Sequence, residues 1–241
     1  MIFMNIPSLY GLFQERWGKF QTGWMISDTH FGDEDLKAGM TRPSDEDIVK
    51  SINSCVGKND LLIHLGDVGD VEYVRKLKGY KVLIMGNHDS GASNYKRQFA
   101  QKEYNQCWTV EGAFADMKKL YPGWKISFHQ VSTGYIVCTA DNGLFDEVYE
   151  GALIVGEKLI LTHEPVEIPW LFNIHGHNHQ GNVKTNNHLN VCSDVVGHKP
   201  VSFNKFLKEG HLSKIQTIHR ACIDNAIERK KKRGGKRIGQ K

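Results

Sequence analysis

The chain has 241 residues, of which 40% are hydrophobic and 24% are charged, and its formal net charge is +4. This composition is that of a soluble globular protein, and no apolar run approaches the about 18 residues that a membrane span needs. The five cysteines form no CxxC pair, which argues against a disulfide framework or a structural zinc site. The N-terminus lacks the basic segment and cleavage site of a signal peptide. We therefore expect a reduced cytoplasmic protein with no membrane partner.

Strands and helices alternate along the first half of the chain. In chain order the predicted elements are a strand over residues 24–26, a helix over 44–56, a strand over 61–65, a helix over 71–78, a strand over 81–85 and a helix over 94–104. Ser44 is the expected N-cap of its helix. This order is typical of an α/β fold whose loops gather at the carboxyl ends of the strands.

The second half continues with short apolar runs. Strands are predicted at residues 125–128, 135–138, 153–155, 158–161, 173–174 and 189–192, and helices at 202–207 and 221–232. There are no internal repeats and no obvious linker. We therefore expect one domain over residues 23–228, an extension over 1–22 that packs on its surface, and a basic tail over 229–241.

A short polar cluster follows each of five predicted strands. The clusters are Asp28-Thr29-His30, Gly66-Asp67-Val68-Gly69-Asp70, Gly86-Asn87-His88-Asp89, Thr162-His163-Glu164-Pro165 and His175-Gly176-His177-Asn178-His179. Any one of them also has a structural explanation, as a turn, a cap or a buried histidine. Together they supply the oxygen and imidazole donors that a two-metal hydrolytic site requires.

Spacing within the clusters indicates how the donors meet. Asp28 and His30 are two residues apart, so their side chains share one face of an extended segment, and His177 and His179 repeat this arrangement. Asp67 follows a glycine that permits a tight turn, which makes it the best candidate for a carboxylate that bridges two metal ions.

The order and spacing of these clusters resemble the five motifs of the calcineurin-like metallophosphoesterases, over about residues 24–194. The resemblance implies a four-layer α/β/β/α sandwich, with two mixed β-sheets flanked by helices. It also implies that a hydroxide bridging two divalent metal ions attacks a phosphate ester. Mn²⁺ is the favoured ion, and Fe, Zn²⁺, Co²⁺ and Ni²⁺ are alternatives for such mixed ligands.

The resemblance also implies residue roles. One metal ion would bind Asp28, His30, Asp67 and His179, and the other would bind Asp67, Asn87, His163 and His177. His88 would contact the phosphate and protonate the leaving group. Asp70 and Asp89 would assist catalysis by orienting histidines through hydrogen bonds.

A closer resemblance is to a small bacterial and phage branch of the family. It rests on Asp28-Thr29-His30-Phe31-Gly32, on Thr41-Arg42-Pro43 and on His64-Leu65-Gly66-Asp67. Arg42, with Asn87 and His88, would then bind the substrate, although Arg42 also fits a surface or helix-entry position. The branch usually has histidine where this chain has Asp33.

The substrate class is narrowed by two features. Asp70 is followed by Val71-Glu72 and not by the Arg-Gly of the phosphoprotein phosphatases. His88 supplies a proton donor for a poor alkoxide leaving group, which slightly favours phosphodiesters. A phosphomonoesterase acting on nucleotides, nucleic-acid ends or proteins is the alternative, and a non-catalytic metal-binding scaffold is a third hypothesis. The oligomeric state is not predicted.

Two further features bear on a nucleotide or nucleic-acid partner. The basic tail over residues 229–241 has the charge to contact phosphates, although it also fits a solvated tail. Trp170 would either stack a base or pack in the core.

Overall fold

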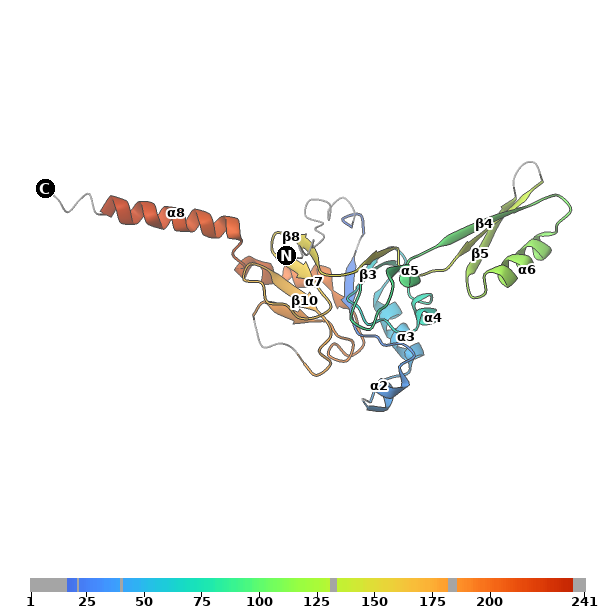
Figure 1. Cartoon of the computed structure of the whole chain (residues 1–241), viewed down its shortest axis with the longest axis horizontal. Helices are drawn as coiled ribbons and strands as arrows, with labels where there is room; N and C mark the ends of the chain where they lie inside the picture. The colour runs from blue at the N-terminus through green and yellow to red at the C-terminus, as the bar shows by residue number, and fades with distance from the viewer. Residues whose placement is uncertain (1–16, 21, 40, 131–133, 182–185, 236–241) are drawn as a thin grey trace.

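Two β-sheets form the body of the structure, a computed structural model that describes residues 17–20, 22–39, 41–130, 134–181 and 186–235 (Figure 1). The first sheet contains, in spatial order, β12 (Val201–Ser202), β1 (Gly23–Ile26), β2 (Leu61–His64), β3 (Tyr80–Ile84) and β7 (Glu147–Tyr149). The second contains β11 (His188–Asn190), β10 (Phe172–His175), β9 (Leu159–Leu161) and β8 (Leu153–Gly156).

Both sheets are mixed. Strands β1, β2, β3 and β7 are parallel, and β12 is antiparallel to β1. Strands β9, β10 and β11 are parallel, and β8 is antiparallel to β9. Strand β2 is buried at every position, which its apolar residues Leu61, Leu62 and Ile63 predict for a parallel strand covered on both faces.

The principal core lies between the two sheets. Met25 and Ile63 from the first sheet meet Leu161 and Ile174 from the second, and all four are fully buried. Leu62 alternates to the opposite face of the first sheet, where it packs against α3 (Asp45–Cys55). Helix and sheets thus form three layers, which confirms a mixed α/β fold with helices flanking mixed sheets. The fourth layer stays a prediction.

The helices of the body are short. Ser44 is the N-cap of α3, as predicted, and its Oγ accepts a hydrogen bond from the Asp47 amide at 3.2 Å. Helix α4 (Val71–Val74) is shorter than expected. The others are α2 (Glu34–Gly39), α5 (Ala92–Tyr95), α7 (Phe203–Lys208) and the 3₁₀ helix η1 (His211–Lys214).

A separate lobe projects from the body (green in Figure 1). It consists of the antiparallel strands β4 (Phe99–Tyr104), β6 (Ile136–Asp141) and β5 (Lys125–Gln130), in that spatial order, and of α6 (Val110–Leu120). The predicted helix over 94–104 is therefore wrong in this region. Ala100 and Tyr104 fit helical spacing, but they also lie on one face of a strand and pack toward α6 with Met117.

The two ends of the described chain differ from the predicted boundaries. Trp17 belongs to the predicted extension, yet it is 2% exposed in the principal core and its Nε1 donates to Glu147 Oε1 at 3.2 Å. At the other end, α8 (Ile218–Gly235) continues past the predicted domain limit at residue 228 and extends away from the body (Figure 1). Residues 236–241 of the predicted tail lie outside the described residues.

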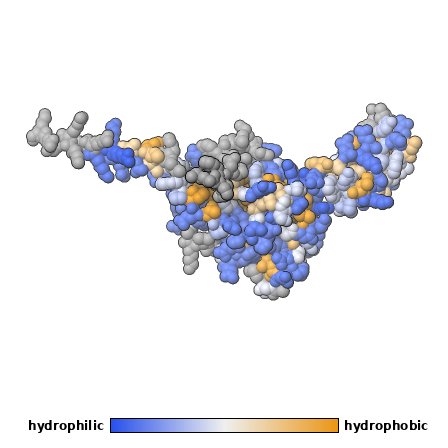
Figure 2. All heavy atoms as spheres, viewed as in Figure 1, coloured by the Kyte–Doolittle hydropathy of each residue, from blue (hydrophilic) through white to orange (hydrophobic). Residues whose placement is uncertain are grey.

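Hydrophilic residues cover much of the body face seen in Figure 2, and hydrophobic ones are grouped in small patches. None of the described helices combines the length and the apolar character needed to cross a membrane.

Candidate metal centre

The five polar clusters meet at one edge of the two sheets. Strands β1, β2 and β3 are parallel neighbours, so the loops that follow them lie at the same edge. Strands β9 and β10 deliver the histidine-containing loops from the second sheet. Asp28 connects the loops of the first sheet with those of the second, because its carboxylate oxygens accept hydrogen bonds from the His177 amide at 3.1 and 2.9 Å.

Six of the predicted ligands form two donor groups. We call Asp28, His30 and His179 the first donor group, and Asp67, His163 and His177 the second. Within each group the ligand atoms all lie within 4.8 Å of one another. Asn87 joins the second group, since its Oδ1 lies 2.8 Å from His163 Nε2 and 3.1 Å from His177 Nδ1.

Asp67 lies between the two groups. Its Oδ2 is 3.6 Å from His30 Nε2 in the first group and 3.2 Å from His163 Nε2 in the second. Its Oδ1 accepts from the His88 amide at 2.9 Å, which fixes the orientation of the carboxylate. This is the position that a bridging ligand needs.

The donor atoms fit a cation. His163 Nδ1 is 2.8 Å from the Leu65 carbonyl, which can only accept, so in neutral imidazole the proton resides on Nδ1 and Nε2 carries a lone pair. That lone pair faces the oxygens of Asp67 and Asn87. Nε2 of His30 is buried and has no hydrogen-bond partner. Acceptors gathered in this way are stabilised by divalent metal ions.

The protonation states also suit metal binding. Burial raises the pKa of Asp67, but hydrogen bonds from His163 and the His88 amide hold it at about 2. Burial lowers the pKa of His30, which keeps this imidazole neutral. Burial lowers the pKa of His163, but the hydrogen bond to Asp67 and the charges of Asp28 and Asp67 outweigh burial and raise the pKa overall. The negative potential that favours a proton on His163 would favour a metal cation in the same way.

The backbone at the centre is strained. Asp28, His30, Asp67 and His177 have φ of 56°, 42°, 55° and 66°, and they are four of the five non-glycine residues with positive φ among those that the structure describes. Left-handed conformations are costly for residues with a Cβ and persist where the surroundings over-determine them.

Small and buried polar residues hold these loops in place. A Cβ at Gly176 would lie 2.3 Å from Asp28 Oδ2, so only glycine permits the close approach of the two loops. His64 is fully buried, and desolvation lowers its pKa to about 4. Its Nε2 lies 3.0 Å from Thr29 Oγ1, which donates to the Val68 carbonyl at 2.9 Å.

The structure gives Asp70 and Asp89 backbone partners in place of the predicted histidines. Asp70 is exposed and caps α4, accepting from the Glu72 amide at 2.9 Å. Asp89 is buried, and its oxygens accept from the amides of Asp67, Val68 and Gly86 at 2.9, 3.0 and 2.9 Å. Asp89 therefore holds the loop that carries Asp67, because three converging amides satisfy its charge better than one imidazole.

Arg42 lies behind the centre and not in the substrate cavity. Its side chain is only 2% exposed, Nη2 donates to the Asp28 carbonyl at 2.9 Å, and Nε is 2.8 Å from Asp194 Oδ1. The predicted phosphate contact is corrected to a supporting role, because a buried guanidinium with these partners is not free to meet a phosphate. Asp194 in turn binds His179, with 2.6 Å between Oδ2 and Nδ1.

Asp194 is a site residue that sequence reasoning did not identify. Its only signal was its position just after the last predicted strand, like the other clusters. By fixing Nδ1 of His179 it leaves Nε2 directed at Asp28, 3.7 Å away. Ligand atoms of Cys192, His179 and Asp194 also lie within 4.8 Å of one another, but burial raises the pKa of the Cys192 thiol, which disfavours the thiolate that a metal would need.

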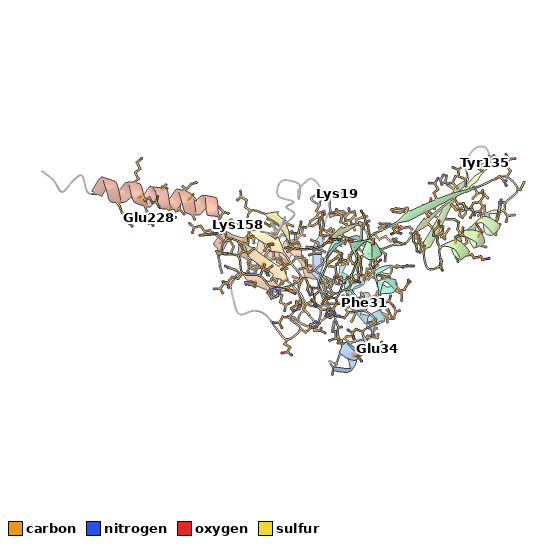
Figure 3. All side chains as sticks on the ribbon, in the orientation of Figure 1. Lys19, Phe31, Glu34, Tyr135, Lys158 and Glu228 are labelled. Carbon is orange, nitrogen blue, oxygen red and sulfur yellow. The ribbon has the colours of Figure 1, made fainter. Side chains whose placement is uncertain are left out.

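His88 lies on the wall of a cavity of about 510 Å³ beside both donor groups. The residues lining this cavity are His30, Asp33, Asp35, Leu36, Asp67, His88, His177 and His179. His88 is exposed, and its ring contacts that of His30 edge-on at 5.4 Å between centroids. Asp33, where the small branch usually has histidine, lines this cavity and directly precedes α2. Figure 3 labels Phe31 and Glu34, which belong to the same segment of the chain.

The model of one protein family, described as calcineurin-like phosphoesterase, matches residues 24–224. The chain belongs to the calcineurin-like phosphoesterase family. This confirms the predicted family, and it supports metal-dependent hydrolysis of phosphoric esters as the class of reaction. Among the curated proteins, none matches the sequence. The chain is also similar to a solved structure, the protein of unknown function AQ665 from Aquifex aeolicus, with 21% identity and a TM-score of 0.49 over 78% of this chain and 98% of that one.

Proposed function

We propose that this calcineurin-like phosphoesterase uses two divalent metal ions to hydrolyse phosphodiesters. The observation that carries the proposal is the position of Asp67, which is shared by two groups of metal-ligating side chains beside a cavity that also contains an exposed histidine. A pair of acidic and imidazole donor sets that share one carboxylate is the arrangement of two-metal hydrolytic sites.

Each residue would have a definite task. The first donor group with Asp67 would hold one ion, and the second group with Asn87 would hold the other. Ions bound there would polarise the phosphoryl oxygens, acidify a water and offset the negative charge that develops. Mn²⁺ is the ion we expect, because it suits mixed carboxylate, amide and imidazole ligands.

His88 is the proposed proton donor. Its backbone amide is held by Asp67, while its side chain faces the open cavity where a leaving group would lie. A positioned imidazole protonates an alkoxide as the ester bond breaks, which matters most when the leaving group is a poor one.

Charge supports a diester over a monoester. No lysine or arginine is among the described residues that line the cavity, whereas Asp33 and Asp35 are among them. A monoester carries a second negative charge for which this mouth offers no cationic partner, and Arg42 is buried behind the centre. A diester, with one negative charge, is repelled less.

The test compares bis-p-nitrophenyl phosphate with p-nitrophenyl phosphate as substrates of the Mn²⁺-loaded protein, with chelated protein as a control. We expect preference for the diester and loss of turnover on chelation. Preference for the monoester would support a phosphatase. Metal bound without turnover of either substrate would support a scaffold.

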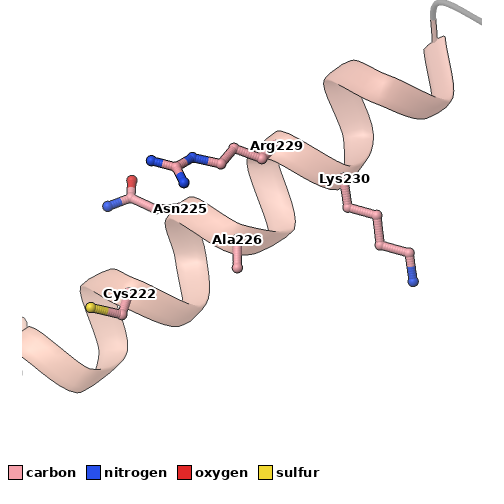
Figure 4. A pocket seen from close by; sticks show the side chains of 5 residues that line it. All are labelled: Cys222, Asn225, Ala226, Arg229 and Lys230. Atoms are coloured by element: carbon pink, nitrogen blue, oxygen red, sulfur yellow. The ribbon is translucent and has the colours of Figure 1, made fainter.

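A polynucleotide is the second candidate substrate, favoured by α8. Figure 4 shows Arg229 and Lys230 extending from this helix, and residues 229–232 are exposed cations. Deleting residues 229–241 should weaken hydrolysis of single-stranded DNA in a salt-dependent way and leave bis-p-nitrophenyl phosphate untouched. Equal loss on both substrates would contradict a role of α8 in binding.

A further inference from the structure

A second cavity, of about 250 Å³, adjoins the metal centre. Asn87 and His163 line it, while Asp67 and His177, which contact these two residues, line the cavity that contains His88. The second donor group therefore separates two cavities. A substrate whose phosphate lies at the metal centre has a recess for one of its two ester groups on each side.

The walls of this second cavity are mainly apolar. Met85, Gly151, Ala152 and Val166 line it, and none of them carries a charge. Glu164 is the one acidic residue among the described residues of the lining, and no lysine or arginine is among them. The cavity therefore suits an uncharged group with a hydrogen-bond donor on its edge and disfavours a second phosphate or an acidic chain.

We propose that this cavity binds the nucleobase of a nucleotide phosphodiester whose phosphate lies at the metal centre. The inference rests on the proposed phosphodiesterase function. A cavity of about 250 Å³ is below the range of about 300–1,000 Å³ typical of larger ligands, so it fits one flat ring and not an acyl chain or a peptide. The thioether of Met85 and the side chain of Val166 offer apolar contacts to the ring faces.

Glu164 would recognise the edge of the base. Its carboxylate can accept an N–H from the base, such as N3–H of thymine or an exocyclic amino group. The loop that carries it is fixed, because Thr162 Oγ1 donates to the Glu164 carbonyl at 2.6 Å.

Gly151 offers a direct way to fill the cavity. A Cβ at Gly151 would meet nothing within 4 Å, and its φ is not in the left-handed region, so a side chain there would extend into open space without strain. Gly86 is not a usable site, because a Cβ there would lie 2.2 Å from Asp67 Oδ1. Gly156, at the end of β8 and outside the cavity lining, is equally open and provides a matched control.

The experiment compares two substrates that share a leaving group, the p-nitrophenyl esters of thymidine 5′-phosphate and of methyl phosphate. In Mn²⁺-loaded Gly151→Leu we expect the kcat/KM ratio of the thymidine ester to the methyl ester to fall about tenfold or more, with the methyl ester unaffected. Gly156→Leu should keep the wild-type ratio. Calorimetric binding of thymidine 5′-monophosphate should weaken in Gly151→Leu alone.

An unchanged substrate ratio and unchanged binding in Gly151→Leu would overturn the assignment of the cavity. If Gly151→Leu melts early, Glu164→Ala replaces it, because alanine removes the acceptor that glutamine would keep. A lower substrate ratio in Glu164→Ala supports the proposal, and an unchanged ratio overturns it. If the wild-type protein hydrolyses neither ester, the proposed phosphodiesterase function is wrong. If it hydrolyses both esters with no preference for the thymidine ester, only the assignment of the nucleobase site is wrong.

Discussion

The metal centre and the lobe of β4, β5, β6 and α6 are constructed in different ways. At the centre, four non-glycine residues adopt left-handed backbone conformations, and contacts between loops of both sheets hold them there. In the lobe, the described residues with positive φ are the glycines Gly123 and Gly134, and the strands pair in a regular antiparallel register. Contacts between loops therefore stabilise strained backbone conformations at the centre, whereas the lobe follows ordinary rules of packing.

The comparison predicts that loss of one carboxylate has very different effects in the two regions. Asp67→Asn should remove the shared anionic ligand and lower kcat/KM for bis-p-nitrophenyl phosphate by more than about 100-fold, together with metal content. Asp116→Asn is the matched control. It alters a half-buried carboxylate of the lobe that pairs with Lys102 at 2.7 Å, and it should change neither the rate nor the metal content. Similar losses of kcat/KM and metal content in both variants would contradict the predicted difference between the metal centre and the lobe.

His88→Ala should separate catalysis from metal binding. Both ions should stay bound, because the His88 side chain is not a ligand in either donor group, while the rate falls by about 10²–10⁴. His129→Ala changes an exposed histidine on β5 of the lobe and should leave the rate unchanged. Full activity of His88→Ala on a diester with an alkyl leaving group would contradict the role of His88.

Asp194→Asn should produce an intermediate effect. It removes the charge that orients His179 and that pairs with Arg42, and comparable changes behind metal ligands cost about 10–100-fold in metal affinity. A Mn²⁺ titration followed by activity should show half-saturation shifted to higher concentration with kcat largely recovered at saturation. An unshifted curve would show that Asp194 does not position His179.

Met117→Ala should have the smallest effect on activity. Met117 is fully buried in the small core of the lobe, so its truncation should cost about 2–5 kcal/mol of local stability. Hydrogen exchange should accelerate in β4, β5 and β6, while kcat/KM for bis-p-nitrophenyl phosphate stays at the wild-type value. A matching loss of activity would mean that the lobe supports the centre.

The members of the two donor groups could be identified from the sequence as candidate ligands, whereas the residues that support them could not. Asp28, Asp67 and Asn87 each follow a parallel strand, and the carboxyl ends of neighbouring parallel strands share one edge of the sheet. The contacts of Arg42 with Asp194, and of Asp89 with three amides, depend on how separate loops meet in space. No local pattern indicates such contacts.

The lobe was the least predictable part of the fold. The sequence predicts strands where β5 and β6 lie, but it favours a helix where β4 lies and gives no signal for α6. Ala100 and Tyr104 are four residues apart, a spacing that fits one face of a helix as well as one face of a strand. Pairing with β6 makes this segment a strand and not a helix. Because that pairing is a contact between residues far apart in the sequence, the local pattern does not indicate it.

Electron paramagnetic resonance of the protein loaded with two equivalents of Mn²⁺ tests whether Asp67 bridges two metal ions. Two ions that share a carboxylate couple magnetically. We predict the spectrum of an exchange-coupled pair in the wild-type protein and its loss in Asp67→Asn. A six-line signal of isolated Mn²⁺ ions in the wild-type protein would contradict this role of Asp67.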